Sequence, residues 1–150
     1  MKKFLSMVLV FVLLISTLSI SAFAAEIPAE KLNGNGSAAR ATREEYDLGT
    51  DGSIRLVSTE CKPYAVLYTY YQYTTNSTEI NVKVKSDISV SMRITLYDAE
   101  TGVRVQQKTV TLYTWNRTVK FSGLTSVDSY YLTFENVGQQ TVHIEGTISA

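Results

Sequence analysis

Cysteine, histidine and tryptophan occur once each in the 150 residues, as Cys61, His143 and Trp115. A single cysteine excludes a disulfide within the chain, so side-chain packing has to stabilise the fold. One histidine and one cysteine also exclude the common zinc sites. His143 alternates with apolar Val142 and Ile144, which favours a surface position, and no Gly-x-Ser-x-Gly elbow occurs. The sequence therefore predicts no catalytic residues, no metal site and no cofactor.

An excess of charge of one sign is also lacking, because 14 basic residues balance 14 acidic ones. Without Lys2 and Lys3, 12 basic residues stand against 14 acidic ones, a net charge near −2. No block of like charge occurs, whereas proteins that bind nucleic acid carry a basic stripe. We therefore expect no nucleic-acid partner.

The first 24 residues have the three-part order of a secretory signal peptide. Lys2 and Lys3 precede an apolar run over residues 4–18, and Ala22 and Ala24 supply the small residues of a cleavage site. The run is shorter than the roughly 20 residues that a membrane-spanning helix needs. We expect a cleavable signal helix over residues 1–24 and a mature chain without a membrane span. A bacterial cell would then secrete the protein, which is released or stays associated with the cell envelope.

Residues 25–52 differ in composition from the rest of the chain. They are small and polar, rich in glycine and asparagine, and poor in large apolar side chains. Such a segment buries too little apolar surface to offset the entropy cost of ordering it. The sequence therefore predicts a flexible linker or pro-segment over residues 25–52 and one folded domain over residues 53–150.

Apolar and polar residues alternate over several runs after Gly52. The runs cover residues 80–84, 88–96, 130–134 and 142–148, with short turn sequences between them. This period of two is typical of antiparallel strands with one face toward the solvent. Residues 103–112 switch parity, which indicates a bulge or a strand that changes sheets. The predicted fold is all-β, an antiparallel β-sandwich of about eight strands.

The stretch TVKFSGLTSVDSYYLTFENVG, residues 118–138, resembles a corner of fibronectin type III and other immunoglobulin-like sandwiches. In that corner a leucine precedes a strand tyrosine by six residues, as Leu124 precedes Tyr130, although Ser126 stands where a proline is usual. The resemblance implies that the Tyr130 hydroxyl bonds the backbone and locks the corner. With ITLYDAETGVRV before it, the stretch also resembles the C-terminal jelly-roll modules of bacterial secreted peptidases. Both resemblances imply a sandwich, immunoglobulin-like or jelly-roll, and neither implies one function.

The stretch YAVLYTYYQYTT, residues 64–75, holds five of the ten tyrosines. On one continuous strand with Leu67 inward, Tyr64, Tyr68 and Tyr70 would form an exposed row, with residues two apart about 7 Å from each other. Flat rings with a hydroxyl group suit contacts with sugars or peptides. The alternative is purely architectural, because tyrosine favours strands and pairs across them.

Three hypotheses for function follow. The favoured one is a secreted, non-enzymatic module that binds extracellular or cell-envelope material, either polysaccharide or protein. Its candidate contacts are Tyr64, Tyr68, Tyr70 and the loop residue Trp115. The alternative is self-association as a structural or matrix protein, because residues 66–73 carry no charge or proline that would protect a strand edge. A second alternative is a small secreted hydrolase.

Overall fold

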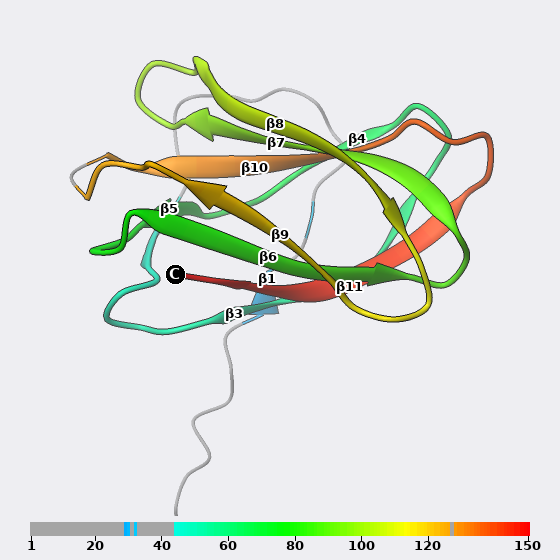
Figure 1. The fold of residues 1–150 in the computed structure, drawn as a ribbon, viewed down its shortest axis with the longest axis horizontal. Helices are drawn as coiled ribbons and strands as arrows, with labels where there is room; N and C mark the ends of the chain where they lie inside the picture. The colour runs from blue at the N-terminus through cyan, green and yellow to red at the C-terminus, as the bar shows by residue number, and fades with distance from the viewer. Residues whose placement is uncertain (1–28, 31, 33–43, 127) are drawn as a thin grey trace, which may run out of the picture.

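The computed structural model describes residues 29–30, 32, 44–126 and 128–150 (Figure 1). The signal helix predicted over residues 1–24 lies outside this part. Among the residues that are described, no helix is long and apolar enough to cross a membrane.

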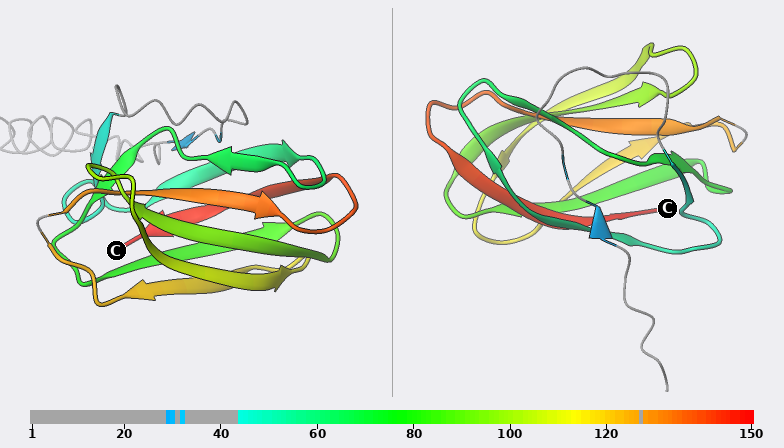
Figure 2. Two further views of the ribbon diagram at one scale, coloured as in Figure 1. Left: turned by 90° about the horizontal axis from the view of Figure 1, so that it is seen from above. Right: turned by 180° about the vertical axis from the view of Figure 1, so that it is seen from behind.

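Two β-sheets make up the described structure and pack face to face (Figure 2). The five-stranded sheet has the order β1 (Ala29–Glu30), β3 (Ile54–Cys61), β11 (Val142–Ser149), β6 (Glu79–Ser86) and β9 (Arg117–Ser122). The six-stranded sheet has the order β2 (Glu45–Asp47), β5 (Gln72–Thr74), β10 (Tyr130–Asn136), β7 (Val90–Asp98) and β8 (Arg104–Leu112), and β4 (Val66–Tyr68) also pairs with β10. Most pairs are antiparallel, while β1–β3 and β2–β5 are parallel. The all-β sandwich is therefore confirmed for the described residues.

The core lies between the two sheets and follows the predicted alternation. On β6 the inward side chains Ile80, Val82 and Val84 are fully buried, and Ile94 and Leu96 of β7 in the other sheet belong to the same core cluster. Ile88 is an exception, because it lies in the turn before β7 and is 37% exposed. Because each sheet buries one apolar face, burial against the opposite sheet stabilises both of them.

The linker predicted over residues 25–52 is wrong for the end of that range. Glu45–Asp47 form β2, which pairs with β5, and Tyr46 and Leu48 are buried in the core. Leu32 is buried there as well. The polar composition of the segment as a whole hid these few apolar anchors, so the folded domain begins before residue 53.

The parity switch over residues 103–112 comes from a bulge. Leu96 pairs with Gln106 and Tyr97 pairs with Arg104, which leaves Val105 as the extra residue of β8. The strand remains in the six-stranded sheet throughout.

Long side chains of β8 reach across to the backbone of β9. The Gln106 amide donates to the Ser122 carbonyl, and the Lys108 ammonium donates to the Lys120 carbonyl. The Lys108 nitrogen also lies 5.6 Å from the centre of the Phe121 ring. These contacts join the two sheets along one side of the sandwich and give donors to alternate carbonyl groups of β9.

Asn136, at the end of β10, is fully buried and ties four segments together. Its side-chain amide donates to the Cys61 carbonyl at 3.0 Å and to the Gln140 carbonyl at 2.8 Å. Its side-chain oxygen accepts from the Gly138 N–H, and its carbonyl accepts from the Tyr64 N–H. Cys61 beside it is buried, and burial raises the pKa of its thiol.

We expect Asn136→Ala to lower the free energy of unfolding by about 2–3 kcal/mol, because the buried Cys61 carbonyl and the part-buried Gln140 carbonyl lose their donor. Denaturant unfolding monitored by fluorescence measures the change. The control is Asn81→Ala, on the outer face of β6, which should cost less than about 0.5 kcal/mol. Equal effects of the two substitutions would contradict the role assigned to Asn136.

Candidate functional site

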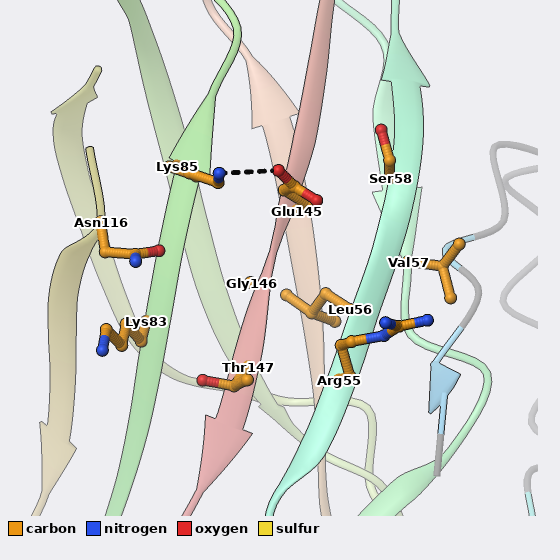
Figure 3. A pocket seen from close by; sticks show the side chains of 10 residues that line it. All are labelled: Arg55, Leu56, Val57, Ser58, Lys83, Lys85, Asn116, Glu145, Gly146 and Thr147. Carbon is orange, nitrogen blue, oxygen red and sulfur yellow. Dashed lines mark ion pairs between the residues drawn. The ribbon is translucent and has the colours of Figure 1, made fainter. Parts of the chain in front are cut away.

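A shallow hollow of about 430 Å³ lies on the outer face of the five-stranded sheet (Figure 3). Strands β3, β11 and β6 form its floor, and the loop before β9 forms one side. Figure 3 shows side chains from all four segments around it. The lining residues are Arg55, Leu56, Val57, Ser58, Lys83, Lys85, Asn116, Glu145, Gly146 and Thr147.

The floor depends on a bulge and on a glycine. Ile144 pairs with Thr59 but Gly146 pairs with Leu56, so two residues of β3 lie opposite Glu145 alone. A Cβ atom on Gly146 would lie 2.0 Å from the Lys83 carbonyl oxygen. Only glycine therefore allows β6 to approach β11 this closely.

A second hollow of about 170 Å³ shares Ser58, Lys85 and Glu145 with the first. It extends the surface to Asp87, Thr114 and His143. Because the two hollows share these walls, we call them together the groove.

The first hollow of the groove carries four charged side chains. The Lys85 ammonium and the Glu145 carboxylate form an ion pair at 2.9 Å. Arg55 and Lys83 line the first hollow, and neither forms an ion pair with another described residue. The remaining polar lining, Ser58, Asn116 and Thr147, offers neutral hydrogen-bonding groups.

His143 lies on the surface at the far end of the groove and contacts Asp87. The backbone N–H of His143 donates to one Asp87 oxygen at 2.9 Å, and its Nδ1 lies 3.2 Å from the other. The backbone hydrogen bond is the largest cause that lowers the pKa of Asp87 below its ordinary value.

An aromatic pair lies in the loop from β8 to β9, which borders the groove. Thr114 and Asn116 line the groove, and Tyr113 and Trp115 alternate with them in the chain. The rings of Tyr113 and Trp115 are stacked, with centroids 4.4 Å apart and planes at 4°. Trp115 is 63% exposed, so much of its ring faces the solvent, although neither aromatic side chain lines either hollow.

The predicted row of tyrosines does not form, because residues 64–75 are not one strand. Leu67 is buried as expected, but β4 ends at Tyr68 and the chain bends at Tyr70 before β5. The Thr69 hydroxyl bonds the backbone of Leu132 at the break. Tyr64 precedes β4 with a left-handed φ of 60°.

The four predicted contact residues lie on separate surfaces. Tyr68 is half-buried on the outer face of the six-stranded sheet, opposite Thr133. Tyr70 is exposed, and its hydroxyl lies 3.4 Å from a Glu44 carboxylate oxygen. Tyr64 is exposed at the same end of the sandwich as Trp115, but next to β3, at the opposite side of the sheet from β9. Of the four, only Trp115 belongs to a loop that borders the groove, through its neighbours Thr114 and Asn116.

The six-stranded sheet has an outer face of another kind. The rings of Tyr97 and Tyr131 stack at 5.0 Å, and the Arg93 guanidinium contacts the Glu135 carboxylate at 2.7 Å. The predicted alternation did place these side chains outward. Tyr131 is nevertheless buried, so this face offers less accessible aromatic surface than Trp115 does.

Leu124 and Tyr130 occupy the corner that the resemblance pointed to. Both are buried, and the Tyr130 hydroxyl accepts from the Thr125 N–H at 3.1 Å. The same hydroxyl lies 3.4 Å from the Thr125 carbonyl oxygen. The tyrosine thus bonds the backbone five residues before it, far from the groove.

Within the described part of the chain, no three histidine, cysteine or acidic residues gather where they could hold a metal ion. The Asp98 carboxylate accepts a hydrogen bond from the Thr101 N–H at 2.6 Å, within the turn that contains both residues.

No protein-family model and no curated protein matches the sequence. Among solved structures, a family 29 carbohydrate-binding module is 9% identical, with a TM-score of 0.45 over 66% of this chain and 71% of its own. A family 6 carbohydrate-binding module is 12% identical, with a TM-score of 0.43 over 73% of this chain and 98% of its own. An insecticidal delta-endotoxin from Bacillus thuringiensis is 13% identical, with a TM-score of 0.35 over 64% and 19%. These scores are too low to assign a ligand to this chain.

We expect Gly146→Ala to destabilise the protein by about 1–3 kcal/mol, because the added methyl group meets backbone atoms that cannot move aside cheaply. Thermal and denaturant unfolding measure the change. Thr147→Ala, at the next position of β11, is the control and should cost less. A neutral Gly146→Ala would show that β6 and β11 can separate freely.

The lowered pKa of Asp87 gives a pH dependence with a defined sign. A carboxylate whose pKa is lower in the folded state adds stability above its ordinary pKa of about 3.9 and loses it as the pH falls. We expect wild type to be more stable than Asp87→Asn at pH 7, with the difference shrinking below about pH 4. Urea unfolding at several pH values tests this, with Glu100→Gln, an exposed acid in another turn, as control. A difference that stays constant with pH would exclude the proposed cause.

Proposed function

We propose that the chain is a secreted, non-enzymatic β-sandwich module that binds a polysaccharide of the cell envelope or the extracellular space. The observation that carries the proposal is the stacked pair Tyr113 and Trp115, with Trp115 exposed, in the loop that borders the groove. A signal peptide over residues 1–24 remains part of the proposal, as the sequence predicts it.

The chemistry of the groove suits sugars. The apolar face of a sugar ring can lie flat on an exposed indole ring, which loses little conformational freedom on binding. Sugar hydroxyl groups need both donors and acceptors, and Ser58, Asn116 and Thr147 offer both. A surface that combines a flat ring with several short polar side chains therefore favours a carbohydrate over an apolar ligand.

The acids of the groove are poorly suited to hydrolysis. Glycosidases use one carboxyl group with a raised pKa as the acid, paired with a second carboxylate. Here the Glu145 carboxylate is held by Lys85, and the pKa of Asp87 is lowered rather than raised. These features support a binding role without catalysis.

We further propose that the sandwich is of the jelly-roll type. Strands β3, β11, β6 and β9 lie opposite β5, β10, β7 and β8, and most connections cross between the sheets. This order supports a jelly roll over an immunoglobulin-like sandwich, whose sheets group the strands differently.

Two strands, β9 and β4, are poorly suited to self-association through strand addition. The β9 carbonyls that face β8 already bond its side chains, and β4 pairs over only three residues. Strand addition needs a long, unpaired edge.

Affinity electrophoresis in gels that contain soluble polysaccharides, with pull-down on insoluble cell walls, tests the proposed function. We expect wild type to be retarded and Trp115→Ala to bind about tenfold more weakly, or about 1.4 kcal/mol, in the range of an aromatic stacking contact. Tyr64→Ala is the matched control, because Tyr64 is equally exposed but lies away from the groove. The proposal fails if wild type binds no polysaccharide, or if Trp115→Ala binds as well as wild type.

A further inference from the structure

The geometry points to an acidic polysaccharide as the ligand of the groove, recognised by Arg55 and Lys83. This inference rests on the proposed function and narrows its substrate class.

Some of the positively charged side chains on this face have a carboxylate partner and others do not. Two lysines of the outer face have carboxylate partners: Lys85 contacts Glu145 at 2.9 Å, and Lys120 contacts Glu79 at 2.7 Å. Lys83 lies between these neutralised pairs on β6, and no described carboxylate pairs with it or with Arg55. The chain has no net charge, yet the floor of the groove has an excess of positive charge.

The two cations lie in one row across the sheet. Thr147 of β11 pairs with Arg55 on one side and with Lys83 on the other. Neighbouring strands are about 4.8 Å apart, so the two side chains start about 10 Å from each other with the threonine between them. Both are long enough to reach an anion placed above Thr147, but in Figure 3 the Arg55 guanidinium and the Lys83 ammonium extend away from Thr147 on opposite sides, so each side chain would turn inward on binding.

Each member of the row would contribute a different contact. The Arg55 guanidinium can donate two parallel hydrogen bonds to a carboxylate or a phosphate. The Lys83 ammonium acts as a point charge, and the Thr147 hydroxyl adds a neutral donor. A neutral sugar would leave both cations without a partner, which favours an acidic chain.

A carboxylate of a uronic acid and a phosphodiester of a sugar- or polyol-phosphate polymer offer the same chemistry here. Isothermal titration calorimetry with polygalacturonate, its methyl ester and a poly(glycerol phosphate) separates these sources. The methyl ester has the same sugar backbone without the charge, so it isolates the contribution of the anion.

We expect wild type to bind at least one of the two anionic polymers, with an affinity that falls as salt is added. Arg55→Gln and Lys83→Gln should each weaken that binding about tenfold. Wild type should bind the methyl ester as weakly as the Arg55→Gln/Lys83→Gln double variant binds the anionic polymer. Arg104→Gln is the control, because it removes the same charge from β8 of the other sheet. Circular dichroism confirms that each variant is folded.

Two results would overturn the inference, and they differ in what they say of the proposed function. If neutral and acidic polymers bind equally and the Arg55 and Lys83 variants match wild type, the ligand is a neutral glycan. Loss of that binding in Trp115→Ala would then leave the proposed function standing. If wild type binds neither neutral nor acidic polysaccharide, both proposals are wrong.

Discussion

The apolar faces of the two sheets have only each other to pack against, and the other features described depend on this constraint. Residues such as Ile80, Val82, Ile94 and Leu96 are fully buried only when both sheets are complete. The chain crosses from one sheet to the other at most connections, so each sheet is assembled from segments far apart in the sequence. The groove lies on the outer face of the five-stranded sheet. The shape of that face therefore depends on the packing of the inner face of the same sheet.

The sequence was informative where a pattern repeats and misleading where a single contact decides. Alternation over several residues predicted the inward faces of β6, β7 and β11, because each side chain reports the same sheet surface. Two parts escaped it. Tyr46 and Leu48 join the core from a segment of polar composition, and a hydroxyl contact of Thr69 breaks the tyrosine-rich stretch into two short strands. Neither contact repeats along the chain, so neither produces a periodic pattern in the sequence.

The candidate site was predictable in part for the same reason. Trp115 stood out as a loop aromatic, whereas the groove beside it depends on the register of strands that meet only after folding. Arg55, Lys83 and Thr147 come from three different strands, and their row exists because β11 pairs with β3 and β6 in one particular register. Sequence patterns fix which face a residue occupies but not its neighbour on the next strand. Gly146 was the available signal, since a glycine inside a strand often marks a bulge or a close backbone approach.

The pairing of the strands also bears on how fast the sandwich can form. Strands β7 and β8 are the only neighbours in the described sequence that pair directly, through the turn at residues 99–103. Every other pair of strands can form only after a longer loop has closed. The pairing of β11 with β3, for example, joins segments from opposite ends of the domain sequence. A high contact order of this kind slows folding, and the β7–β8 hairpin is the one described pairing of consecutive strands that forms by closing a short turn. A newly made chain would thus spend more time unfolded than a chain whose strands pair mainly with their neighbours in sequence.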